Sequence, residues 1–99
     1  MIRHVVVFAW LAEATDEQKQ HASDQIATLP SQMTGLRAYH FGPDAGLVSG
    51  NADFAIVADF DSADDYEAYR THPSHLAVIE RAVRPITRQR LAAQFEIPA

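Results

Sequence analysis

The sequence contains no cysteine, which excludes disulfide bonds and metal sites built on thiolates. It also lacks a long hydrophobic run, because the first apolar stretch ends at Glu13 and is too short to span a bilayer. That stretch is not followed by the small residues of a signal-peptide cleavage site. Basic residues are few, with 8 Lys and Arg against 13 Asp and Glu. The net charge of −5 argues against general affinity for nucleic acid or anionic lipid. We therefore expect a cytoplasmic protein that binds neither a membrane nor nucleic acid.

The length and the apolar content suit one compact domain. The chain has 99 residues, 47% of them hydrophobic, and we assign residues 1–99 to a single domain. A monomer of this size buries only about 60–65% of its unfolded surface. A partner subunit would therefore help to stabilise it.

Four segments have the composition and alternation of β-strands: residues 2–11, 36–41, 54–60 and 87–97. The segment 54–60 alternates most clearly. In the last segment, apolar and polar residues also alternate, which predicts a half-buried strand with Leu91, Ala93, Phe95 and Ile97 on one face. Glycine and proline gather between the second and third segments, which predicts a long hairpin loop.

Capping signals predict where the helices begin. Thr15 is followed by Gln18 at the third helical position, which is a capping box, and Pro30 marks the end of that helix. Ser62 is followed by Ala63, Asp64 and Asp65, which puts an acid at the third helical position, and it opens a second helix. A further helix follows and ends at Pro85.

The resulting order of strand, helix, strand, strand, helix pair and strand is the β-α-β-β-α-β pattern of a ferredoxin-like α+β sandwich with a four-stranded antiparallel sheet. Helices can cover only one face of such a sheet. The first strand is nevertheless apolar on both, with Phe8 and Trp10 on one face and Val5 and Val7 on the other. An uncovered apolar face is an interaction surface. We therefore expect a homodimer, packed sheet to sheet into a dimeric α+β barrel with a central cavity.

Tyrosines and histidines gather around one predicted corner. Tyr66 and Tyr69 are three residues apart and share a helix face. His72 precedes a proline and is pushed out of the helical region, whereas Pro73 is suited to start the next helix. This corner can turn His75 toward the same cavity as Tyr69. We assign structural roles to His72, as a helix cap, and to Tyr66, as a core residue.

The chain resembles the stress-responsive A/B barrel (Dabb) family over essentially its whole length. The resemblance lies in an N-terminal Ile-Arg-His-Val-Val-Val-Phe strand, followed by Phe-Asp-Ser-Ala-Asp-Asp-Tyr-Glu-Ala-Tyr and His-Pro-Ser-His-Leu. It implies a dimeric barrel, and many members are known only as stress-associated domains. One branch, which includes plant olivetolic acid cyclase, closes linear polyketides by aldol condensation without a cofactor. By motif position, the resemblance implies that Tyr69 and His75 form the acid–base pair and that His4 lines their cavity.

An aldol closure needs a base beside a carbonyl and a donor for the developing oxyanion. Histidine, with an unperturbed pKa of about 6.5, suits the first role, and a tyrosine hydroxyl suits the second. We predict His75 as the base and Tyr69 as the oxyanion donor. His4, Phe8 and Trp10 share a face of the first strand and are expected to contact the substrate.

Other functions stay open. The first interpretation is a binding or stress-associated domain that holds a small, partly apolar molecule. The second is a cofactor-independent cyclase or lyase. No feature of the sequence distinguishes this second activity from that of a cofactor-free monooxygenase. Pro73 interrupts the pair His72 and His75, which disfavours a metal site. A haem would need a proximal histidine such as His75 or His4, but nothing selects for it. The acidic balance opposes RNA binding.

Overall fold

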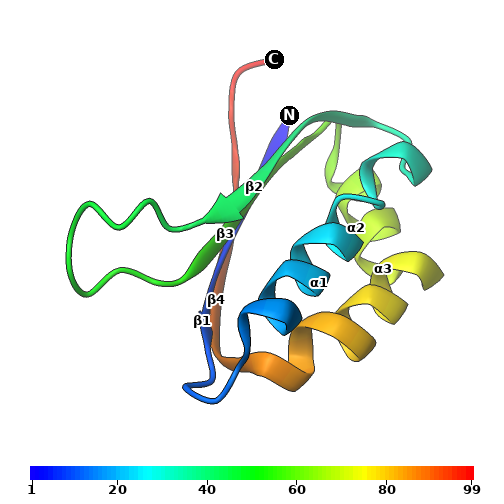
Figure 1. Ribbon diagram of the computed structural model, residues 1–99. Coiled ribbons are helices and arrows are strands. Elements are labelled where there is room, and N and C mark those ends of the chain that lie inside the picture. The colour runs from blue at the N-terminus through cyan, green and yellow to red at the C-terminus, as the bar shows by residue number, and fades with distance from the viewer.

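The computed structural model describes all residues from Met1 to Ala99. The chain forms one four-stranded antiparallel sheet with the helices on one of its faces (Figure 1). The strands stand in the order β2-β3-β1-β4: β1 (Ile2–Trp10), β2 (Leu36–Pro43), β3 (Phe54–Phe60) and β4 (Thr87–Glu96). The ferredoxin-like α+β prediction is therefore confirmed.

The first two helices begin where the capping signals predict. α1 (Asp16–Ile26) has a complete capping box, because the Gln18 N–H donates to Thr15 Oγ1 at 3.1 Å and the Thr15 N–H donates to Gln18 Oε1 at 2.9 Å. α2 (Ala63–Thr71) is capped by the Ser62 hydroxyl, which accepts from the Asp65 N–H at 3.2 Å. α1 ends earlier than predicted, and a short 3₁₀ turn, η1 (Pro30–Gln32), starts at the proline that was expected only to end the helix.

The helical stretch after the predicted corner is not one α-helix. It begins as α3 (Pro73–Val78), widens into a π-helix, η2 (Ile79–Val83), and tightens into a 3₁₀ turn, η3 (Arg84–Ile86). Pro85 has no N–H to continue the α-helical ladder, and the hydrogen-bond spacing changes as the chain approaches it. None of the helices has the length and apolar character needed to span a membrane.

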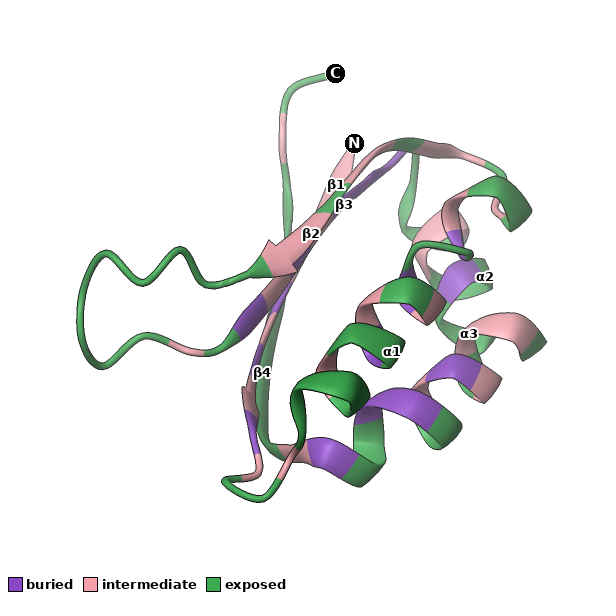
Figure 2. Cartoon of the chain, in the orientation of Figure 1, coloured by how far each residue is buried: buried purple, intermediate pink, exposed green.

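The hydrophobic core lies between the sheet and the helices (Figure 2). Alternate residues of β1 and β3 point to this side and are buried: His4, Val6, Phe8, Trp10, Phe54, Ile56, Ala58 and Phe60. Side chains of α1, α2 and the helical segments after the corner close the core from the other side, among them Ile26, Tyr69 and Val83.

The other face of the sheet carries no helix, as the sequence predicted (Figure 1). The strand register brings apolar side chains of three strands together on this outer face: Val5, Val7, Ala55, Val57, Leu91 and Ala93. Leu91 exposes 61% of its surface and Phe95 exposes 49%. The chain by itself therefore leaves a continuous apolar surface open to solvent.

In the single chain, β4 is not the half-buried strand that its alternation predicts. Its apolar residues lie on the outer face, and its polar face looks toward the helices, because the register pairs Arg90 with Phe8 and Gln94 with His4. β4 is an edge strand, and nearly all of its residues are exposed. α2 packs against β1 and β3, whereas β4 is coloured almost entirely as exposed in Figure 2, so the inner side of β4 is left open. That open side positions the site described next.

Candidate active site

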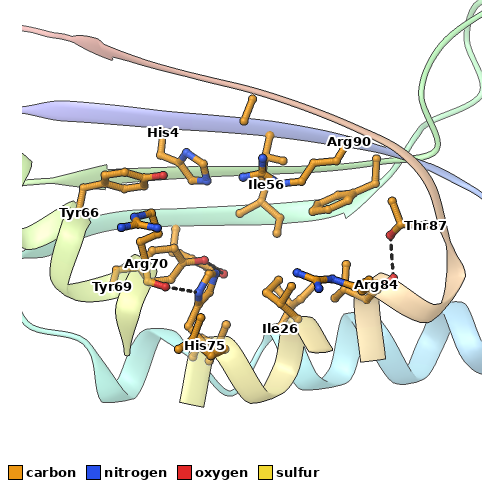
Figure 3. Close-up of a pocket in the computed structure, with 18 of the residues that line it drawn as sticks. His4, Ile26, Ile56, Tyr66, Tyr69, Arg70, His75, Arg84, Thr87 and Arg90 are labelled. Carbon is orange, nitrogen blue, oxygen red and sulfur yellow. Dashed lines mark hydrogen bonds between the residues drawn. The ribbon is translucent and has the colours of Figure 1, made fainter. Parts of the chain in front are cut away.

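A cavity of about 650 Å³ lies between the sheet and the helices of one chain (Figure 3). Its walls are mainly apolar, with side chains such as Val6, Ile56 and Val83. The sequence predicted a central cavity between the sheets of two subunits, whereas this cavity is formed within a single chain. It exists because the helices do not cover the inner side of β4, whose residues Ala92 and Gln94 form part of the wall.

Tyr69 and His75 meet at the corner between α2 and α3. Their ring centroids are 4.3 Å apart, and both side chains line the cavity. The backbone of His72 is extended, with φ −61° and ψ 133°, as expected before a proline. This single extended residue ends α2 and redirects the chain into α3, so that the end of one helix and the first turn of the next present both rings to the same space.

His72 itself caps a helix. Its Nδ1 accepts from the Ser74 N–H at 3.0 Å, which satisfies a free donor at the start of α3. The sequence predicted that this ring would cap the end of the preceding helix, and it caps the start of the following one instead. The side chain does not line the cavity.

His75 is held as a neutral ring with a free Nε2. Its Nδ1 lies 3.1 Å from the carbonyl oxygen of Arg70, and because a carbonyl only accepts, Nδ1 carries the proton and donates. Burial lowers the pKa of His75; the Arg70 carbonyl opposes this shift, and the positive charge of Arg90 adds to it. At neutral pH the ring therefore has an unprotonated Nε2, which is the form that a general base requires.

His4 carries its proton on the other nitrogen. The side-chain amide of Gln94 donates to His4 Nδ1 at 2.9 Å, so the neutral ring bears its proton on Nε2. Burial lowers the pKa of His4 to about 4; the positive charge of Arg90 acts in the same direction, and so does that of His75 when His75 is protonated. His4 lies 6.3 Å from Tyr69, measured between ring centroids. The site thus combines one histidine that accepts with one that donates.

Tyr69 is buried at 3% exposure and is hydrogen-bonded to a residue that sequence reasoning missed. The hydroxyls of Tyr69 and Tyr39, on β2, are 3.2 Å apart. Burial raises the pKa of both phenols above the ordinary value, so both keep their protons at neutral pH. When Tyr39 donates, the Tyr69 proton is free for a ligand. The strand register places Tyr39 opposite Ala58, on the inner face of the sheet, and the sequence pattern did not indicate which face Tyr39 occupies.

Three arginines also line the cavity, and no aspartate or glutamate does. Arg70 is paired with Glu67, at 3.0 Å from its Nε to Oε2, and Arg84 is paired with Glu80 at 3.1 Å. Arg90 reaches in from β4 (Figure 3). Sequence reasoning missed Arg90 because it expected the polar face of β4 to lie toward solvent, and no motif in the sequence singled out Arg70 or Arg84.

A family model described as the stress responsive A/B barrel domain, Dabb, matches residues 2–97. The chain belongs to the Dabb family. This confirms the resemblance seen in the sequence, and it agrees with the ferredoxin-like topology of the sheet.

Solved structures similar to this Dabb protein include a dimeric ferredoxin-like protein of unknown function from Thermobifida fusca. It is 38% identical, with a TM-score of 0.90 over 97% of this chain and 90% of that one. Hydroxynitrile lyase from Passiflora edulis is 16% identical, with a TM-score of 0.84 over 98% and 93% of the two chains. SnoaB, a cofactor-independent oxygenase from Streptomyces nogalater, is 11% identical, with a TM-score of 0.77 over 99% and 93%. Because the last two are less than 25% identical to this chain, they establish only that the fold is shared. Comparison with curated proteins gave no match.

The Dabb cavity brings together four of the five predicted site residues: His4, Phe8, Tyr69 and His75. Trp10, predicted to contact a substrate, lies outside this cavity. Its ring stacks on Phe8, with centroids 5.5 Å apart and an interplanar angle of 11°, and packs against Phe54. Trp10 therefore supports the wall from behind. Tyr66, which was assigned to the core, lines the cavity and lies 5.0 Å from His4 between ring centroids.

The histidines of the Dabb corner do not converge on one point. His72 directs its Nδ1 to Ser74 and His75 directs its Nδ1 to Arg70. No group of three or more His, Cys, Asp or Glu side chains is placed to hold a metal ion. The polar groups that line the cavity are mainly imidazole, phenol and guanidinium groups.

Proposed function

We propose that this Dabb protein is a homodimer that binds a small, partly apolar molecule in the cavity and transfers protons on it without a cofactor, as an aldol-type cyclase or related lyase. His75 is the base and Tyr69 is the oxyanion donor. The proposal depends on one observation above all: a neutral histidine with a free Nε2 lies beside a protonated, buried tyrosine in an apolar cavity.

In the proposed reaction, His75 Nε2 removes a proton from a carbon next to a carbonyl, and the C–H electrons move into the enolate. Tyr69 donates a hydrogen bond to the enolate oxygen. In ring closure, the enolate carbon attacks a second carbonyl of the same molecule and forms the C–C bond. The imidazolium of His75 then returns its proton to the new alkoxide, and the enzyme is regenerated. His4 Nε2–H is suited to hold a carbonyl oxygen in position.

Similar solved structures support both the proposed dimer and the proposed enzymatic activity. The similar protein from Thermobifida fusca is dimeric, and the outer face of this chain is apolar and open, which supports a homodimer through that face. Proteins of the same fold include a hydroxynitrile lyase and a cofactor-independent oxygenase, so the fold serves enzymes. A binding domain without chemistry is the second candidate, because the Tyr69 hydroxyl already has a partner in Tyr39.

A deuterium-exchange experiment tests the proposal. Aryl alkyl ketones are first screened by thermal shift, and exchange at the carbon next to the carbonyl of a stabilising ketone is then followed by NMR in D₂O. We expect His75→Gln to reduce the enzyme-dependent exchange by about 10²–10⁴-fold while the ketone still stabilises the variant. Tyr69→Phe should reduce it by about 10–10²-fold.

The control variant is His21→Gln, because His21 is an exposed histidine of α1 that does not line the cavity. It should exchange deuterium at the wild-type rate. Undiminished exchange in His75→Gln would remove the base from the proposal. A ketone that stabilises the wild type without any exchange would favour the second candidate, a binding domain.

A further inference from the structure

The charge of the cavity is opposite in sign to that of the chain. The whole sequence has a net charge of −5. The ionisable residues that line the cavity are nevertheless two histidines, three tyrosines and three arginines, with no carboxylate among them. Both histidines are neutral at neutral pH because burial lowers their pKa values. The only side chains of the cavity wall that carry a charge at neutral pH are therefore the three arginines, and that charge is positive.

Arg90 differs from the other two arginines of the cavity. Arg70 is held by Glu67 of the same helix, and Arg84 is held by Glu80, one turn earlier in η2. The Arg90 guanidinium has no ion-pair or hydrogen-bond partner in the protein. An arginine stays charged at any physiological pH and presents its N–H donors in a planar fork. The fork of Arg90 is thus free to take a ligand.

The position of Arg90 puts this free charge within the reaction space. The strand register places it opposite Phe8, which lines the cavity. Figure 3 shows its side chain extending from the sheet past Ile56, on the same side as His4 and across from Arg84. Its charge lowers the pKa of both His4 and His75, which means that both imidazoles lie within its electrostatic reach.

We infer that the cavity takes a carboxylate-bearing molecule with a partly apolar, aromatic or polyketide-like body, and that Arg90 anchors the carboxylate. This inference rests on the proposed function and names the substrate class of the same site. The apolar body then lies along Phe8, Ile56 and Val83, and its far end reaches Tyr69 and His75.

A carboxylate fits the free donors better than other anions. One guanidinium fork matches one carboxylate through two parallel hydrogen bonds. A phosphate monoester carries up to two charges and is bound best by several free cations. Here Arg70 and Arg84 already neutralise their glutamates, so only Arg90 is available. A neutral ligand would form no charge-assisted hydrogen bond with Arg90 and would gain nothing from its charge.

Calorimetry with two nearly isosteric probes tests the inference. The probes are 4-butylbenzoate and 4-butylbenzamide, which share the ring and the tail but differ in charge. We expect the wild type to bind the benzoate more than about 10-fold more tightly than the benzamide. Arg90→Gln should weaken benzoate binding by about 10–100-fold and leave benzamide binding within about 2-fold.

Arg88→Gln is the matched control, because Arg88 is an exposed, unpaired arginine of the same strand that does not line the cavity. It should keep the wild-type preference for the benzoate. Arg90→Lys, which keeps the charge but loses the fork, should retain part of the preference. The melting temperature of each free variant should match the wild type, since Arg90 is exposed and makes no contact that the fold needs.

Other results would contradict either the carboxylate preference of the cavity or the role of Arg90 as its anchor. Equal binding of both probes by the wild type would overturn the carboxylate inference and leave the cavity as a site for neutral molecules. Loss of the preference in Arg88→Gln as well would mean general charge attraction and no anchor at Arg90. Failure of both probes to bind would overturn the carboxylate inference and count against the proposed function.

Discussion

The two cavity histidines illustrate how a backbone and an amide can set opposite tautomers in one site. The Arg70 carbonyl forces His75 to keep its proton on Nδ1, and the Gln94 amide forces His4 to keep its proton on Nε2. Neither ring can exchange roles without losing its hydrogen bond. A substrate therefore meets an acceptor for its proton on the helix side of the cavity, His75 Nε2, and a donor for its carbonyl oxygen on the sheet side, His4 Nε2–H.

The depressed pKa of His4 makes stability depend on pH. The unfolded chain binds a proton at His4 below about pH 6.5, but the folded chain does so only below about pH 4. Between these values protons favour the unfolded state, so the free energy of unfolding falls as the pH falls through this window, by up to about 3 kcal/mol. Above the window, His4 contributes no pH dependence.

Urea unfolding at neutral pH and at about pH 4.5 measures this effect. We expect the acid-induced loss to be clearly smaller in His4→Gln than in the wild type, and unchanged in His21→Gln. Part of the loss should persist in His4→Gln, because burial lowers the pKa of His75 as well. Identical losses in the wild type and in His4→Gln would contradict a depressed pKa at His4.

Sequence alone predicted the cavity residues that carry the Dabb motif and missed those of β2 and β4. Tyr69 and His75 lie within one short stretch whose proline announces the corner. Tyr39, Gln94 and Arg90 come from other strands, and their roles follow only when it is known which face of each strand turns inward. For β4 that choice cannot be made from alternation, because both faces of an uncovered edge strand are exposed.

At the scale of elements, the site depends on a junction of two helices with no loop between them. His72 closes α2 and caps α3, and Pro73 supplies a φ angle that suits the first helical position. Capping rules predicted the starts of α1, α2 and α3. They could not predict the π-helix of η2, because capping rules describe helix ends and say nothing of the hydrogen-bond spacing inside a helix.

The cap at His72 can be tested by substitution. His72→Ala should lower the free energy of unfolding by about 1 kcal/mol, because the Ser74 N–H loses its acceptor. His72→Asn should recover most of this loss, since asparagine is among the best residues for capping a helix start. Urea unfolding of the three proteins provides the comparison. Equal destabilisation by alanine and asparagine would show that capping is not what His72 contributes.

At the scale of the whole molecule, the position of the helices determines which parts of the sheet are buried and which stay accessible. They cover β1 and β3 on one side, leave the cavity open along β4, and leave the outer face bare. The sequence predicted the bare face from the apolar residues on both sides of β1. It did not predict where the cavity lies, because the helix spacing over the sheet depends on packing that no local pattern encodes.

The proposed dimer is tested at Leu91, on the outer face. Leu91 is 61% exposed in the single chain and lies opposite Val7, so Leu91→Glu should not disturb the fold of one subunit. In a sheet-to-sheet dimer the substitution would bury an unpaired carboxylate from each subunit, at a cost of several kcal/mol. We expect the wild type to sediment as a dimer at micromolar concentration and Leu91→Glu to sediment as a monomer. Leu47→Glu, at an 86% exposed leucine in the β2–β3 hairpin loop, should stay dimeric. A monomeric wild type would overturn the dimer, and a dimeric Leu91→Glu would exclude this face as its interface.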